Sequence, residues 1–209
     1  MSAQPPAAAQ SSREAILGRV RRALEPLRER ASLPEYDPQL VVTLPGGADL
    51  WTTFCQKLKT VNGLALETVA ALKAHLRDRK VTVVYCDPAL RASVGDVLGP
   101  DITVEYAFDR AKLDTYGAGI TRAVGAIAET GSIVINDAST SSRLGALAPW
   151  IHIAVLAPGD LWPDIPSALA RLGPDPNTIW ITGPSKTADV EGILIEGVHG
   201  PGEQICLRL

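Results

Sequence analysis

The sequence predicts an α/β fold with a mostly parallel central sheet and helices on both faces, preceded by an N-terminal helical arm. Three observations support this prediction: short β-branched runs recur along the chain, they alternate with stretches of helical periodicity, and 209 residues fit one domain of ordinary size. Parallel strands need crossover connections, which are usually helices. The alternation therefore favours a parallel sheet.

The N-terminal segment predicts an amphipathic helix. Ser11 and Glu14 have capping-box spacing, and Ile16, Val20 and Leu24 recur on one helical face. We therefore divide the chain into a tail and helix over residues 1–46 and an α/β domain over residues 47–209, because turn-rich sequence precedes the boundary. The helix either binds a partner as an arm or packs on its own domain, and the sequence leaves both alternatives open.

The elements of the α/β domain are expected in a fixed order. Helices are predicted near 50–58 and 66–76, and strand 81–86 is followed by a helical stretch to about Val97. Further strands are predicted at 102–108, 132–136, 151–156, 178–182 and 204–207. Ligands of such sheets bind beyond the carboxyl ends of the strands, so the loops after Asn136, Leu156 and Thr182 are the expected walls of a site.

Composition excludes several classes of function. A formal net charge of -3 gives no broad positive field, so a nucleic-acid partner is not expected. The three cysteines form no C-x-x-C pair, which predicts no metal, iron–sulfur cluster or other cofactor in this chain. The N-terminus lacks the order of a secretory signal, and no stretch is long enough to span a bilayer. We therefore expect a cytoplasmic protein without membrane insertion.

Glu129 is the first candidate for chemistry. It comes directly before the predicted buried strand 132–136, where a carboxylate needs a partner or serves as an acid, base or nucleophile. The alternative is a structural ion pair with Arg122 or Arg143 at the end of the sheet. The nearby Gly117 and Gly119 do not form a dinucleotide fingerprint, because Arg122 occupies the position of its third glycine.

The polar loop 137–143 and the following strand supply two further candidates. Arg143 offers a planar, two-pronged donor to a carboxylate or a phosphate, although the loop could equally be an ordinary solvated one. His152 enters an apolar strand. It is either a hydrogen-bonded core residue or a group that contacts a ligand.

The segment GPSKTADVEGIL after strand 178–182 predicts a turn that leads into a helix. Gly183, Ser185 and Thr187 would then present amides and hydroxyls to an anion at the helix start, unless Ser185, Thr187 or Asp189 only caps the helix. His199 lies in a glycine-rich turn, where its ring stays near the surface. We expect it to polarise a substrate oxygen or to orient Asp189 or Glu191.

Three stretches, GITRAVGAIAETGSIVI, PWIH and ITGPSKTADVEGILIEGVHGP, resemble the signature segments of the LutC/YkgG-type LUD-domain family, formerly DUF162. The resemblance implies a fold like that of the NagB/RpiA/CoA-transferase group, which contains the glucosamine-phosphate and ribose-5-phosphate isomerases. It also implies a non-redox subunit of a system that oxidises L-lactate to pyruvate, with iron–sulfur subunits and a small organic anion as partners. A homo-oligomer is a further possibility.

The family motifs also imply a set of site residues. The predicted catalytic residues are Glu129, Asp189 and His199, and the predicted substrate-binding residues are Thr130, Gly131, Arg143, His152, Gly183, Ser185, Thr187 and Glu191. The hypothesis is that turns far apart in the chain meet in one anion-accepting hollow. An alternative function is a stand-alone enzyme acting on a sugar phosphate, a folate or a CoA ester, so the sequence leaves open whether the chain is an enzyme.

Overall fold

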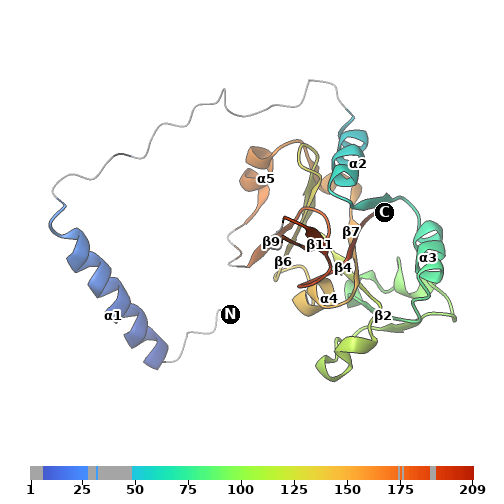
Figure 1. Cartoon of the computed structure of the whole chain (residues 1–209), viewed down its shortest axis with the longest axis horizontal. Coiled ribbons are helices and arrows are strands. Elements are labelled where there is room, and N and C mark those ends of the chain that lie inside the picture. Colours follow the sequence, from blue (N-terminus) through green and yellow to red (C-terminus); the bar gives the residue numbers. More distant parts are fainter. Residues whose placement is uncertain (1–6, 28–31, 33–48, 174, 176, 189–191) are drawn as a thin grey trace. The chain divides into compact units, whose positions relative to one another are not determined.

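The computed structural model describes residues 7–27, 32, 49–173, 175, 177–188 and 192–209 (Figure 1). The chain divides into two compact units, residues 1–42 and 43–209. The first unit contains helix α1 (Ala7–Leu24), which begins before the predicted start at Ser11. The turn-rich segment and the predicted boundary between residues 46 and 47 lie outside the described residues, so that boundary stays a prediction.

The second unit contains four α-helices and twelve short strands within its described residues. The helices are α2 (Leu50–Thr60), α3 (Val69–Asp78), α4 (Arg143–Leu147) and α5 (Ile165–Arg171). The strands are β1 (Leu64–Leu66), β2 (Val83–Cys86), β3 (Thr103–Glu105), β4 (Ala118–Arg122), β5 (Gly125–Ile127), β6 (Ser132–Asn136), β7 (Ile151–Leu156), β8 (Leu161–Trp162), β9 (Thr178–Ile181), β10 (Lys186–Ala188), β11 (Leu194–Glu196) and β12 (Glu203–Arg208). None of these helices has the length and apolar character needed to cross a membrane.

A six-stranded sheet forms the centre of this unit. Its strand order is β1-β12-β7-β4-β2-β3, and every neighbouring pair is parallel. The predicted mostly parallel α/β fold is therefore confirmed. The buried run Val83–Cys86 and the apolar run Ile151–Leu156 form β2 and β7, as the sequence predicted, because both lie in the interior of the sheet.

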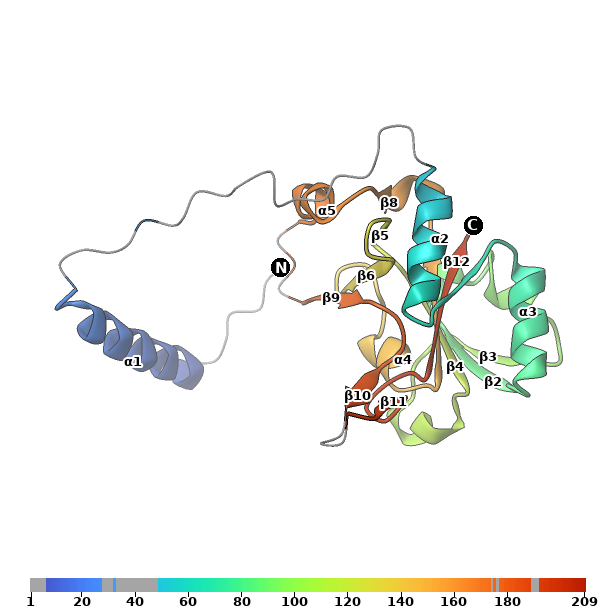
Figure 2. The same cartoon turned by 45° about the horizontal axis from the view of Figure 1, so that its top comes forward.

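The two faces of this sheet have different coverings. On one face, Ile151 and Ile153 of β7 pack with Leu72 and Leu76 of α3. On the other, Ala154 packs with Phe54 and Leu58 of α2, so α2 and α3 lie on opposite sides of the sheet (Figure 2). Successive residues of a strand point to opposite faces, which places His152 on the α2 side together with Ala154.

A second sheet, with the order β8-β5-β6-β9, packs on the α2 side. Its β5–β6 and β6–β9 pairs are antiparallel. Ile133 of β6 faces the α2 side, whereas Val134 packs with Trp162 and with Ala168 of α5. The sequence predicted strands β6 and β9 of this sheet, but it did not predict a separate antiparallel layer.

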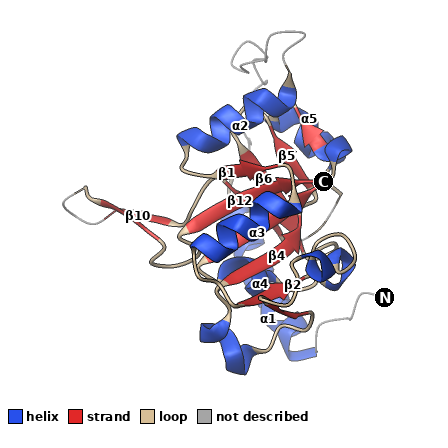
Figure 3. Cartoon of the chain, turned by 90° about the vertical axis from the view of Figure 1, so that its right-hand side faces the viewer, coloured by secondary structure: helices blue, strands red, loops and turns tan. Residues whose placement is uncertain are grey.

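The structure corrects two predicted helices. The segment after β9 forms the antiparallel hairpin β10–β11, which projects from the edge of the unit (Figure 3), instead of the predicted helix. After β2 the chain forms two short 3-10 helices, Pro88–Leu90 and Gly95–Val97, in place of one α-helical stretch. In the hairpin, Thr187 pairs with Ile195, so its backbone is extended.

Strand β4 lies at the middle of the sheet although the sequence did not predict it. Its Gly119 is buried, and a Cβ atom there would lie 1.7 Å from the carbonyl oxygen of Gly145 in α4. The backbone of α4 therefore lies directly on the sheet at this point. Only a residue without a side chain allows this approach, which explains a glycine in a central strand.

We predict that Gly119→Ala lowers the free energy of unfolding by about 2 kcal/mol or more, because α4 must move away from β4. Urea-induced unfolding measures the change. Gly159→Ala is the matched control, since a Cβ atom there meets nothing within 4 Å, and it should change stability by less than about 0.5 kcal/mol. Equal stability of the two variants would show that α4 does not lie on Gly119.

Candidate functional site

A cavity of about 280 Å³ lies between strand β9 and the α2-side face of the parallel sheet. Its residues come from β7, β12, β9, α4 and the turns around β10 and β11: Ala146, Leu147, His152, Ile179, Trp180, Ile181, Thr182, Gly183, Pro184, Ser185, His199, Gly200, Pro201 and Gln204. We call this space the inter-sheet cavity. Of the predicted site residues, His152, Gly183, Ser185 and His199 line it.

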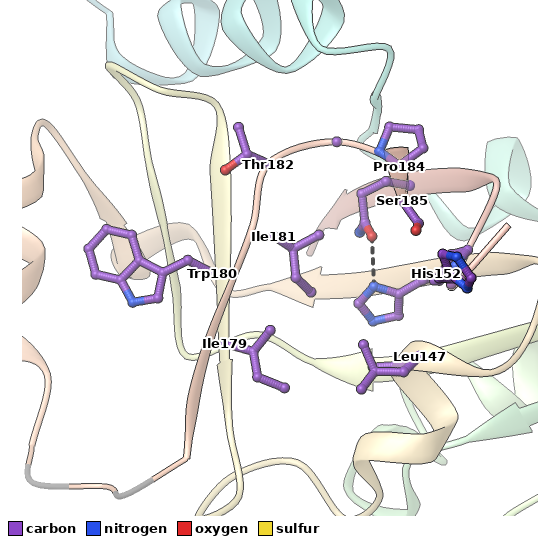
Figure 4. A pocket seen from close by; sticks show the side chains of 14 residues that line it. Leu147, His152, Ile179, Trp180, Ile181, Thr182, Pro184 and Ser185 are labelled. Atoms are coloured by element: carbon purple, nitrogen blue, oxygen red, sulfur yellow. Dashed lines mark hydrogen bonds between the residues drawn. The ribbon is translucent and has the colours of Figure 1, made fainter. Parts of the chain in front are cut away.

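Two layers of the fold form the walls of the inter-sheet cavity. Ile179 and Ile181 of β9 point toward His152 and Leu147, while Trp180 and Thr182 point to the other side of the strand (Figure 4). Trp180 instead packs against the cluster beneath α5. Apolar walls around a few polar groups are typical of small-molecule sites.

Three hydrogen-bonded side chains cross the parallel sheet below this cavity. His152 Nδ1 lies 2.8 Å from Gln204 Oε1, and His152 Nε2 lies 2.8 Å from Thr121 Oγ1. All three residues are at most 2% exposed. Gln204 pairs directly with His152 between β12 and β7, whereas Thr121 pairs with Ala154 and reaches His152 diagonally on the same face of the sheet.

The partners of His152 determine its protonation state. A carboxamide oxygen only accepts, so His152 Nδ1 donates its hydrogen to Gln204, and Nε2 accepts the hydroxyl hydrogen of Thr121. Burial lowers the pKa of His152 to about 4, although the hydrogen bond to Gln204 opposes this shift. His152 is therefore a neutral imidazole whose two nitrogens are both occupied, and it has no free nitrogen for acid–base work.

Ser185 and His199 lie in the turns beside this row. The backbone amide of Ser185 donates to the Pro201 carbonyl, and the Ser185 carbonyl accepts from the Gly197 amide. These hydrogen bonds join the residue before β10 to the turn after β11. His199 is exposed on the turn that follows β11. The Ser185 hydroxyl and the His199 imidazole are thus two polar groups that a ligand from solvent can reach.

Only glycine fits at positions 183 and 131, because the backbone at both lies against the end of α2. Both have positive φ angles, +82° and +69°. A Cβ atom at Gly183 would lie 2.2 Å from the carbonyl oxygen of Val61, and one at Gly131 would lie 2.4 Å from the amide of Leu58. Gly183 also lines the cavity, whereas Gly131 does not. A substrate-binding role for either glycine stays a prediction.

Glu129 lies apart from the inter-sheet cavity, in the turn between β5 and β6. One carboxylate oxygen accepts the amide of Ile165, and the other is buried without a partner among the described residues. Burial raises the pKa of Glu129, and the negative charge of Asp164 raises it further. Lys57 acts in the opposite direction and lowers the pKa. The alternative of an ion pair with Arg122 or Arg143 is not found among the described residues.

The remaining predicted residues are also dispersed. The Thr130 hydroxyl donates to Ser132, and Ser132 shares a hydrogen bond with Thr182 on the rim of the cavity, at 2.8 Å each. Arg143 begins α4 and forms an exposed ion pair with Asp137, at 2.8 Å. Asp189 and Glu191 lie outside the described residues.

The hypothesis of one common hollow is therefore wrong for Glu129 and Arg143, which do not line this cavity, whereas Ser185 and His199 do line it. Binding of an anion there stays a prediction. The predicted position is confirmed only for the loop after Thr182, whose residues Gly183, Pro184 and Ser185 line the cavity. The loops after Asn136 and Leu156 do not line it, and His152 and Gln204 are the second residues of β7 and β12. The cavity lies toward the amino ends of these strands. The helix start that was expected to bind an anion at Thr187 is a strand.

Sequence reasoning missed Thr121 and Gln204, which hold His152. The signal for Gln204 was a polar residue inside an apolar terminal strand, one place from the strand's start. Thr121 had no comparable signal, because β4 was not recognised as a strand.

A model of the LUD domain family matches residues 64–207, which is more than half of the chain. The chain belongs to the LUD domain family. Its parallel sheet lies within the matched range, except for the last residue of β12. The family resemblance predicted from the sequence is confirmed.

Several relatives of the chain carry the same name. "Lactate utilization protein C" of Deinococcus radiodurans is 32% identical over 139 residues, covering 63% of this chain and 63% of that protein. The protein of the same name from Exiguobacterium sp. is 42% identical over 91 residues, covering 40% of each chain. The matched regions thus span from two fifths to less than two thirds of these relatives' lengths.

A solved structure has the same fold as this LUD domain. The crystal structure of a DUF162 family protein from Deinococcus radiodurans superposes with a TM-score of 0.54 at 20% sequence identity. The match covers 76% of this chain and 95% of the other. At this identity the likeness establishes the fold alone.

We predict that the LUD domain loses stability as the pH falls from about 6.5 to about 4, because unfolding releases a histidine that then binds a proton. The pKa of His152 is lower in the folded state, so the unfolded state binds more protons in this window. The loss should approach roughly 3 kcal/mol. Urea unfolding at a series of pH values measures it.

The variants His152→Gln and His199→Gln show which histidine causes the pH dependence of stability. His152→Gln should lose most of this pH dependence, whereas His199→Gln, which changes an exposed side chain, should keep it. The account of a neutral buried His152 is contradicted if both variants show the pH dependence of the unaltered chain.

Proposed function

We propose that this LUD domain chain is a non-redox subunit of a system that oxidises L-lactate to pyruvate, and that the inter-sheet cavity binds a small organic acid. The match to the LUD domain family, together with relatives named lactate utilization protein C, carries the proposal. The cytoplasmic location predicted from the sequence forms part of it. Iron–sulfur subunits as partners are also part of the proposal, since electrons from lactate need an acceptor that this chain is not expected to supply.

The geometry of the cavity supports the binding of a small acid. His152 is neutral with both nitrogens occupied, so it offers no acid or base to a bound acid. Glu129, the predicted catalytic carboxylate, does not line the cavity. Ser185 and His199 remain as polar groups beside apolar walls, an arrangement that suits a carboxylate with a short carbon chain.

The alternative of a stand-alone enzyme acting on a sugar phosphate, a folate or a CoA ester has lost its main support. That alternative was motivated by an anion site where a strand turns into a helix at Ser185 and Thr187. In the described residues this segment continues as strand β10 and pairs with β11. The phosphate-binding helix start is thus replaced by a hairpin.

Deletion of the gene tests the proposed role. We expect the deletion strain to stop growing on L-lactate as its carbon source and to grow normally on pyruvate, because only the oxidation step is lost. Expression of the unaltered chain should restore growth. Normal growth of the deletion strain on L-lactate would contradict the role in lactate utilisation.

The double variant Ser185→Ala with His199→Gln tests the cavity. It should lower the rate of growth on L-lactate severalfold, because both polar groups available to the acid are lost. Ser167→Ala is the matched control, a half-buried serine of α5 that does not line the cavity, and it should restore normal growth. Full growth with the double variant, at equal protein levels, would place the acid elsewhere.

Co-purification tests the partners. A tagged full-length chain, expressed at its natural level in cells grown on L-lactate, should retain proteins with the visible absorption of iron–sulfur clusters. If the chain elutes without such proteins while the strain still needs it for growth on L-lactate, the proposal of an iron–sulfur partner is wrong.

A further inference from the structure

A second cavity, of about 330 Å³, lies at the opposite ends of the parallel strands. Its residues end or follow four of these strands: Ala89, Leu90 and Ser93 after β2, Arg122 and Ala123 at the end of β4, Val155 and Ala157 at the end of β7, and Leu209 after β12. We call it the carboxyl-end cavity. None of these residues lines the inter-sheet cavity.

This cavity lies where the direction of the chain's connections changes. From β2 the chain continues outward to its neighbour β3, whereas from β4 it proceeds toward β7 on the other side. The loops that leave the adjacent strands β2 and β4 therefore separate, and they open a crevice between them. Crevices of this kind, at the carboxyl ends of parallel strands, are the usual ligand sites of open α/β sheets.

Arg122 gives the cavity its charge. It is the last residue of β4 and pairs with Val155, on the same face as the buried Ala118 and Ile120. The side chain lines the cavity and is not in an ion pair with any described residue. A guanidinium at the end of an apolar row offers two parallel donors to a carboxylate.

The backbone that carries Arg122 is held in place from both sides. The Thr140 hydroxyl donates to the Arg122 carbonyl at 3.2 Å, and the Ala123 amide donates to Val155 at 2.9 Å. These contacts fix the end of β4, so the ligand would not need to order it.

Asp87, which directly follows β2, does not neutralise Arg122. Its carboxylate is 2% exposed and accepts the backbone amides of Ser141, at 2.8 Å, and Ala89, at 2.9 Å. Asp87 therefore ties the loop before α4 to the end of β2. The negative charge stays engaged with amides, which leaves the guanidinium of Arg122 for an external anion.

We propose that the carboxyl-end cavity binds a short-chain monocarboxylate, whose carboxylate pairs with Arg122 and whose carbon chain lies against Leu90, Ala123 and Val155. Ala89, Ala157 and Leu209 are also apolar, and the remaining lining residue, Ser93, donates its hydroxyl hydrogen to the Leu90 carbonyl at 3.4 Å. A phosphate ion gains little from such walls, because all its oxygens need polar partners. The proposal does not rest on the role in lactate utilisation, since it concerns a different cavity with its own charge.

Isothermal titration calorimetry of the full-length chain with butyrate, L-lactate and inorganic phosphate tests this proposal. Butyrate should bind more tightly than phosphate. Its affinity should fall at least about tenfold in Arg122→Gln, since a hydrogen-bonded charge pair is lost. The matched control is Arg171→Gln, an exposed arginine at the end of α5 without an ion pair among the described residues, and it should bind as the unaltered chain does.

Two further measurements keep the proposal testable if Arg122→Gln fails to fold. Ala157→Phe places a ring in the cavity and should also abolish the butyrate binding that depends on Arg122, and the Nε–H resonance of Arg122 should shift when butyrate is added to the unaltered chain. The proposal is overturned if butyrate shows no saturable binding or binds Arg122→Gln equally well. Loss of all butyrate binding in Ser185→Ala, with Arg122 unchanged, would assign the acid to the inter-sheet cavity alone and would also overturn the proposal.

Discussion

The hydrogen-bonded row Thr121–His152–Gln204 is the constraint on which the inter-sheet cavity depends. A buried imidazole is tolerated only when both nitrogens have partners, and here each comes from a neighbouring strand of the same sheet. The row thereby fixes the face of β4, β7 and β12 below the cavity. Gly119, which pairs with His152, admits the backbone of α4 beside the row, so one wall of the cavity also rests on this register.

The apolar strands of the fold were predictable because a short run of apolar residues in the sequence is enough to indicate a buried strand. β2 and β7 are short apolar runs, and a strand buried on both faces needs little else. β4 was missed because Gly119 and Arg122, which are not typical of a buried strand, have roles that appear only in the folded structure: Gly119 admits α4, and Arg122 lines a cavity at the strand's end. The hairpin β10–β11 was taken for a helix because its apolar residues, Ile193–Ile195, follow no strand alternation.

The site was predictable only in part, for a related reason. Gly183, Ser185 and His199 meet because the hydrogen bonds between Ser185, Gly197 and Pro201 bring their turns together. Glu129 carries a raised pKa, as expected for a carboxylate beside a buried strand, yet the mixed second sheet places it beside the start of α5 and not in the cavity. The packing of one sheet on the other determines where Glu129 lies, and no local sequence pattern predicts that packing.

Nitrogen-15 NMR of the imidazole rings tests the central claim most directly, because it reports which nitrogen of each histidine carries hydrogen. The account predicts that His152 in the folded chain remains neutral at pH 6, with hydrogen on Nδ1 and a bare Nε2, as its partners Gln204 and Thr121 require. A His152 that is doubly protonated at pH 6, or that carries its hydrogen on Nε2, would contradict the row and the cavity floor built on it.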